Sequence, residues 1–189
     1  WFNCKNVTRW ILYNGSQNII NNWGEDDEVF SYGQQENMLK GIKKKTKNLI
    51  AMNMHLDIFQ NLKNKDRSGF CYLLHKHTSP NATKFFEEVN ATNLSHWKTV
   101  PNHRNYLNEE FNKYEYFVCY DQLSFWPQIA ALCGCKVIVM NTKDNPHSFY
   151  NYKITPEQYR LENPLKKYGV AFGFDDLQHA INTQHLVED

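Results

Sequence analysis

Short apolar runs separated by polar turns predict alternating strands and helices along most of the chain. The apolar run 116–120 stops abruptly at Asp121, and a polar loop follows. Pro127 then opens a segment rich in Ala and Leu that ends at Gly134, and the run 136–140 resumes as a strand. Neither run alternates polar with apolar residues, which is typical of strands covered on both faces. The unit therefore predicts part of a parallel sheet packed between helices.

The rest of the chain extends the same alternation. Strands are predicted at 7–13, 28–32, 48–52 and 70–74, a compact turn at 55–59, helices at 81–89, 106–113, 155–160 and 175–183, and a last edge strand or loop at 168–173. This order predicts an α/β fold, a Rossmann-like and mainly parallel sheet with helices on both faces. The polar break around 63–69 divides the chain into an N-terminal segment with a connector, 1–66, and a Rossmann-like domain, 67–189.

Composition and charge narrow the classes of partner. The 189 residues are 41% hydrophobic, which is enough to bury a core. The net charge of +1 gives no electrostatic reason to expect a nucleic-acid partner. The chain has no apolar run long enough to span a bilayer and no signal-peptide pattern at its start. Because it opens on Trp1, we expect an excised domain whose partner is another domain of the same polypeptide.

The cysteines indicate a compartment. Their number is five, which is odd, and several lie within or beside apolar runs, where a free cysteine behaves as a small hydrophobic residue. We therefore expect a reducing, cytoplasmic location. The alternative is secretion, suggested by five Asn-x-Ser/Thr sequons at Asn6, Asn14, Asn81, Asn90 and Asn93.

The loop 121–125 is the first candidate site. Ligands of parallel sheets bind beyond the carboxyl ends of the strands, at helix N-termini. Asp121 and Ser124 flank the start of the predicted helix, whose free N–H groups suit a pyrophosphate. Lys76, at the end of an earlier strand, projects into the same crevice. The alternative is structural: Asp121 or Ser124 only caps the helix, and Lys76 is exposed to solvent.

Other chemistries lack the motifs that they require. His75 with His77, and Cys133 with Cys135, have no partners at the spacing of zinc ligands, so no metal is predicted. The chain has no nucleophile elbow, no P-loop and no dinucleotide fingerprint, so no cofactor is predicted. A hydrolase that uses Asp121 with Mg²⁺ is a weaker interpretation, because no second carboxylate follows in that loop.

Four pieces of the chain, in order, carry a resemblance to a known family. They are RSGFCYLLHK at 67–76, FVCYDQLS at 117–124, AALCGCKVIV at 130–139 and YGVAFG at 168–173. Together they resemble the nucleotide-sugar-binding, C-terminal half of GT-B-type glycosyltransferases. The chain departs from that pattern in the stretch 75–77, where the family prefers Arg-Lys-Gly, and at Phe172, where it has Tyr.

The resemblance implies one lobe of a GT-B-like fold and a glycosyltransferase that needs no metal. Its donor would be a nucleotide sugar, and its acceptor a glycan or glycoprotein. Carried over by position, the donor-binding residues would be Lys76, Asp121 and Ser124, with Arg67, Tyr120 and Phe125 as further candidates.

No catalytic residue is assigned, since His103, His147 and His179 match no motif. The other lobe would supply the base for the acceptor hydroxyl. The alternative function, from a different class, is a non-catalytic α/β module derived from such a fold that binds a glycan or a protein.

Overall fold

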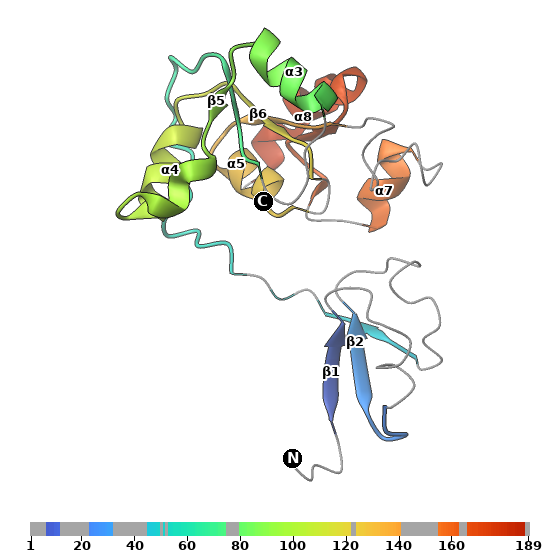
Figure 1. Cartoon of the computed structure of the whole chain (residues 1–189). Coiled ribbons are helices and arrows are strands. Elements are labelled where there is room, and N and C mark those ends of the chain that lie inside the picture. Colours follow the sequence, from blue (N-terminus) through green and yellow to red (C-terminus); the bar gives the residue numbers. More distant parts are fainter. Residues whose placement is uncertain are drawn as a thin grey trace. The chain divides into compact units, whose positions relative to one another are not determined.

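The computed structural model describes residues 7–11, 23–31, 45–49, 51, 53–74, 80–121, 124–140, 155–162 and 166–187. The chain forms two compact units, Trp1–Asn53 and Met54–Asp189, and each contains its own parallel sheet (Figure 1). The predicted α/β fold with parallel strands and flanking helices is therefore confirmed, and its arrangement is Rossmann-like.

The first unit contains a three-stranded parallel sheet of β1 (Thr8–Ile11), β2 (Glu28–Ser31) and β3 (Lys47–Asn48), in that order. These strands lie within or beside the predicted strands 7–13, 28–32 and 48–52, whose remaining residues lie partly outside the described ranges.

Burial of a few side chains holds this small sheet together. Ile11 and Val29 are buried, and the Arg9 guanidinium forms an ion pair with the Asp27 carboxylate. The same carboxylate accepts a hydrogen bond from the backbone N–H of Gly24 at 3.0 Å, which fixes the turn before β2.

The second unit contains a five-stranded sheet in which every pairing is parallel. Its strands are β4 (Phe70–Tyr72), β5 (Thr92–Asn93), β6 (Tyr116–Cys119), β7 (Lys136–Val139) and β8 (Val170–Phe172). Their spatial order is β5-β4-β6-β7-β8, so β8 is the edge strand that the sequence left open between strand and loop. The order reverses between β4 and β6, which makes that junction the topological switch point of the sheet.

Helices connect these strands. They are α3 (Pro80–Glu88), α4 (His103–Phe111), α5 (Trp126–Leu132), α7 (Pro156–Glu162) and α8 (Leu177–Thr183), with 3-10 turns η1 (Ser95–Thr99), η3 (Phe174–Asp176) and η4 (Gln184–Leu186). The predicted helices are confirmed with shifted ends, whereas β5 and η1 were not predicted. No helix within the described ranges is both long enough and apolar enough to cross a membrane.

The start of α7 follows the chemistry of its sequence. Thr155 and Gln158 cap each other: the Gln158 N–H donates to Thr155 Oγ1 at 3.3 Å, and the Thr155 N–H donates to Gln158 Oε1 at 2.8 Å. This reciprocal pair is a capping box, and Pro156 stands at the first helical position, where a missing N–H costs nothing.

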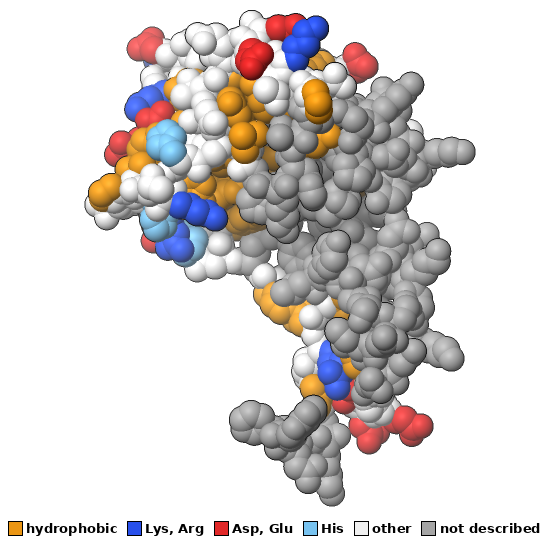
Figure 2. Space-filling view, viewed as in Figure 1, with side chains coloured by type: hydrophobic (Ala, Val, Ile, Leu, Met, Phe, Trp, Pro, Cys, Tyr) orange, Lys and Arg blue, Asp and Glu red, His pale blue; other side chains and the backbone are white. Residues whose placement is uncertain are grey.

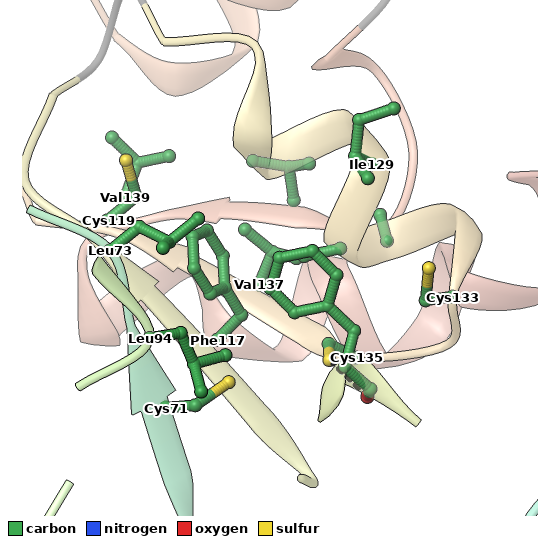
Figure 3. Close-up of a cluster of buried hydrophobic side chains, with 14 of the residues drawn as sticks. Cys71, Leu73, Leu94, Phe117, Cys119, Ile129, Cys133, Cys135, Val137 and Val139 are labelled. Carbon is green, nitrogen blue, oxygen red and sulfur yellow. Dashed lines mark hydrogen bonds between the residues drawn. The ribbon is translucent and has the colours of Figure 1, made fainter. Parts of the chain in front are cut away.

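Each face of the five-stranded sheet has its own core. Phe117 and Val137 point toward α4 and α5, and their side chains lie side by side below Ile129 of α5 in Figure 3. Val118 and Tyr120 point the other way and pack on Ala82 of α3 and its neighbours. Helices therefore cover both faces, and this burial explains why the sequences of β6 and β7 show no polar alternation.

Residues 54–66, which the sequence analysis placed in the connector, belong to the second unit. The Gln60 N–H donates to Asn108 Oδ1 at 3.0 Å, and the Leu62 N–H donates to Asn112 Oδ1 at 2.8 Å. The side chains of Asn108, in α4, and Asn112, at its C-terminal end, therefore hold residues 54–66 against this helix. The predicted turn at 55–59 is confirmed, because the N–H groups of Ile58 and Phe59 both donate to the His55 carbonyl.

Candidate functional site

The candidate site lies at the carboxyl ends of β4 and β6, the central strand and one of its neighbours. Because the strand order reverses between them, this edge is a topological switch point, the place where open parallel sheets bind their ligands. The loop after β6 contains Asp121 and Ser124. The segment after β4 contains Lys76, which lies outside the described residues, so its position relative to the loop stays a prediction.

The loop after β6 is a tight turn with buried polar groups. Asp121 and Ser124 are only 7% and 6% exposed. The Ser124 N–H donates to the Asp121 carbonyl at 3.1 Å, and Ser124 Oγ accepts a hydrogen bond from the Trp126 N–H at 3.3 Å. Ser124 therefore satisfies one N–H at the first residue of α5, but the N-cap position itself is Phe125, which makes no side-chain capping hydrogen bond.

A lysine that the sequence analysis did not single out joins this loop. Lys166 is 6% exposed, and Cys119 and Asp121 at the end of β6 both affect the pKa of its ammonium. Burial lowers the pKa of the Lys166 ammonium to about 8, against the opposing effects of Cys119 and Asp121. At pH 7 Lys166 is therefore still mostly protonated, roughly nine molecules in ten.

The thiol of Cys119, which lies at the end of β6, is neutral. Burial, reinforced by the charge of Asp121, raises the pKa of the Cys119 thiol to about 12. The thiol donates a hydrogen bond to the Asp121 carbonyl at 3.2 Å. Cys119 is consequently a protonated structural residue at neutral pH and not a nucleophile.

Two further predicted residues flank the loop with different surroundings. Tyr120 is 3% exposed, and its ring belongs to the core cluster beneath α3 together with Val118. Phe125 is half-buried and packs against the larger core on the opposite face. The structure therefore brings Asp121, Ser124 and Phe125 together, while the Tyr120 ring packs on the α3 side.

Arg67 lies at the opposite end of the sheet. It precedes β4, and its guanidinium donates to the carbonyls of Phe111 and Cys133 at 2.8 and 2.6 Å and to the side-chain oxygens of Asn61 and Asn112 at 3.1 and 2.5 Å. These acceptors lie before β6 and β7, at the amino ends of the strands. The structure thus does not bring Arg67 to the loop after β6, and its contacts are those of a structural brace.

An aromatic group extends from the start of α5 to η1. The Trp97 ring lies edge-on to Trp126 with centroids 4.9 Å apart, and His103 stacks obliquely on Trp97 at 5.3 Å. His96, next to Trp97, shares a hydrogen bond of 3.0 Å with the Tyr106 hydroxyl. Figure 2 shows histidine, lysine and arginine side chains gathered over this part of the second unit.

No described contact places His179 at the loop after β6. His179 Nε2 is 2.8 Å from the Lys167 carbonyl oxygen, and His147 lies outside the described residues. Within those residues, no three His, Cys, Asp or Glu side chains come together as a metal site.

A cavity of about 780 Å³ lies elsewhere in the second unit, between α5, the segment 54–63 and the residues near Val187. Its lining is mainly apolar, with Met54 and Leu132 among the contributors, and it contains none of the predicted site residues that the structure describes. The lining also includes Lys63 and Lys167, so cations do not distinguish this cavity from the loop. The loop after β6 is the candidate because it lies at the carboxyl ends of the strands at the switch point, where open parallel sheets bind their ligands.

No protein-family model matches the chain, and neither a curated protein nor a solved structure matches it.

Proposed function

We propose that the second unit binds the diphosphate of a nucleotide sugar between the carboxyl ends of β4 and β6, and that the protein transfers the sugar to a glycan or protein acceptor. The observation that carries the proposal is the buried polar loop with Asp121 and Ser124 at the topological switch point, where open parallel sheets bind their ligands. The resemblance of four sequence pieces to GT-B-type glycosyltransferases favours a nucleotide sugar over other anions.

The chemistry of the transfer suits such a site. When the bond between the sugar and the diphosphate breaks, negative charge accumulates on the leaving nucleoside diphosphate. Fixed cations and N–H dipoles stabilise that charge, and the resemblance assigns this role to Lys76. The proposal therefore needs no metal, and it assigns the base for the acceptor to another domain of the same polypeptide.

A cytoplasmic location is part of the proposal. The described cysteines, Cys71, Cys119, Cys133 and Cys135, are free and buried. Thiols that serve as packing groups suit a reducing compartment, where disulfides do not persist.

Calorimetric titration of the full-length protein with UDP, GDP and their sugars tests the function. We expect Lys76→Ala and Asp121→Ala each to weaken binding of one of these ligands at least about tenfold, which corresponds to about 1.4 kcal/mol. Lys84→Ala is the matched control: this lysine is exposed on α3, and we expect no change.

Two results would contradict the proposal. One is that the full-length protein binds none of these nucleotides, and the other is that the affinity is the same in both variants and the wild type. Binding of a glycan without any nucleotide would instead support the non-catalytic module.

A further inference from the structure

The cavity between α5 and the segment 54–63 has the size and the lining of a small-molecule site. Its volume of about 780 Å³ falls within the range of roughly 300–1,000 Å³ that is typical of ligand pockets. All of its lining residues belong to the second unit and lie within the described ranges. Most of the lining is apolar or aromatic and includes Met54, Phe59, Leu132, Tyr168 and Val187. The cavity therefore suits the apolar body of a ligand.

Hydrogen bonds of the protein itself fix the wall that residues 54–63 form. Two bonds to the side chains of α4 and its C-terminal end anchor the later part of this wall. His55 and Lys63 have left-handed backbone, with φ of 49° and 56°, a conformation that residues other than glycine adopt rarely. The His55 carbonyl accepts two N–H groups of the turn that follows, and the Lys63 N–H donates to Asn61 Oδ1 at 3.0 Å. The wall is thus preformed.

Gln128 of α5 adds a hydrogen-bonding group to the lining that the protein does not use. The residue is 5% exposed and lines the cavity. Its Oε1 atom is buried and has no hydrogen-bond donor among the described residues. An unpaired buried acceptor is costly, so this oxygen calls for a donor. A hydroxyl or N–H group on a ligand in the cavity would supply one.

Two lysines give the same cavity a positive charge. Lys63 and Lys167 both line it, and both side chains are exposed. The Lys167 ammonium lies over the Tyr168 ring, 5.0 Å from the centroid, and that ring is itself part of the lining. Among the described residues that line the cavity there is no Asp or Glu, so its charged side chains are all positive. They attract a negatively charged group.

We propose that this cavity binds an amphipathic organic anion, with an apolar or aromatic body inside, a hydroxyl or N–H group on Gln128 and an anionic group beside Lys63 and Lys167. The extent of the apolar wall distinguishes this ligand from a nucleotide sugar, whose surface is mainly polar. The inference does not depend on the proposed function, because neither Asp121 nor Ser124 lines the cavity.

Fluorescence titration of the full-length protein with anilinonaphthalenesulfonate tests the inference. This probe combines aromatic rings, an N–H group and an anionic sulfonate. The comparison is phenylnaphthylamine, which has the same rings and N–H group but no charge. We expect the sulfonate to bind at one site per chain, and the neutral probe to bind at least about threefold more weakly.

A larger side chain in the cavity locates the bound probe. Leu132→Trp fills part of the cavity, so we expect both probes to bind at least about tenfold more weakly. Leu161→Trp is the matched control, because Leu161 is 84% exposed on α7 and does not line the cavity. This control should bind both probes like the wild type.

Polar substitutions separate the parts of the ligand. The double variant Lys63→Gln/Lys167→Gln should weaken binding of the sulfonate at least about threefold and leave the neutral probe unchanged. Its control is Lys65→Gln/Lys84→Gln, which removes the same charge at exposed lysines outside the cavity. Gln128→Leu removes the acceptor, so both probes should bind about threefold more weakly.

Three outcomes would overturn the inference. The wild type binds neither probe, or Leu132→Trp binds both like the wild type, or the sulfonate is indifferent to the loss of Lys63 and Lys167. If circular dichroism shows that Leu132→Trp does not fold, Leu56→Asp replaces it, because Leu56 lines the cavity and is 59% exposed. This variant should bind the sulfonate at least about fivefold more weakly, and binding like the wild type would equally overturn the inference.

Discussion

The two ends of the five-stranded sheet use cations in opposite ways. At the amino end, Arg67 donates to backbone carbonyls and asparagine oxygens of three separate segments. At the carboxyl end, the ammonium of Lys166 is buried, and Cys119 and Asp121 act on its pKa against the effect of burial. Arg67 is thus held by neutral acceptors and has no anionic partner among these contacts, whereas burial dominates the surroundings of Lys166 and lowers the pKa of its ammonium.

This difference distinguishes a cation used as a multiple hydrogen-bond donor from a buried cation with a shifted pKa. A guanidinium offers five donors in a fixed fork, which suits several carbonyls at once. A lysine ammonium is a compact charge whose pKa shifts on burial, and such groups cluster at functional sites. The contacts of Arg67 at the amino end are structural, and the proposed function places ligand binding at the carboxyl end; three predictions test this contrast.

The largest effect is expected at the amino end. Arg67→Met leaves the carbonyls of Phe111 and Cys133 without their donor, so we expect the free energy of unfolding to fall by about 4 kcal/mol in urea denaturation. Binding of UDP or GDP by the folded protein should not change. The control is Lys65→Met at a nearby exposed lysine. An equal loss of stability in this variant would show that the hydrogen bonds of Arg67 do not account for the effect.

The next effect is a pH dependence at the carboxyl end. Burial lowers the pKa of Lys166 to about 8 from its ordinary 10.5, so between these values the unfolded chain holds a proton that the folded chain has lost. The wild-type free energy of unfolding therefore gains from this group as the pH rises through that window. Relative to Lys166→Met, the wild type should gain up to about 3 kcal/mol.

Urea denaturation of both proteins across this window measures that gain. The raised pKa of Cys119 works in the opposite direction above its ordinary value of 9.0, but it does so in both proteins, and the comparison removes it. A stability difference that stays constant with pH would show that Lys166 is not a buried charge.

The smallest effect is expected at Ser124. Ser124→Ala removes the acceptor for the Trp126 N–H, and we expect a loss of about 1 kcal/mol in the free energy of unfolding. If Ser124 also contacts the donor, calorimetry should show that the affinity for UDP or GDP falls by about fivefold, while Ser124→Thr retains most of it. An unchanged affinity would mean that Ser124 only accepts the hydrogen bond from the Trp126 N–H.

The sequence predicts correctly those strands whose side chains are buried on both faces of the sheet. The apolar runs 116–120 and 136–140 became β6 and β7, because a central parallel strand needs apolar side chains on each side. By contrast, β5 consists of two polar residues, Thr92 and Asn93, at the edge of the sheet. Its pairing arises from tertiary contacts, so no pattern in the sequence indicated it.

The candidate site shows a similar limit. Lys166 and Lys167 are adjacent and chemically identical, yet the first is buried and the second exposed, a difference that only the tertiary structure determines. Arg67 is a different case, since a signal was present. A residue that precedes a parallel strand stands at its amino end, and ligands bind at the carboxyl end. That rule alone places Arg67 away from the loop after β6.

The Arg67 brace also has a consequence for how the chain assembles. Its acceptors at Phe111 and Cys133 are 44 and 66 residues away in sequence, so the brace closes two long loops. The unit from β6 through α5 to β7 is local and can form earlier. During synthesis, Arg67 emerges from the ribosome well before Cys133. The set of hydrogen bonds that Arg67 makes, including the one to Asn61 in the segment 54–66, therefore cannot be completed until α5 has been made.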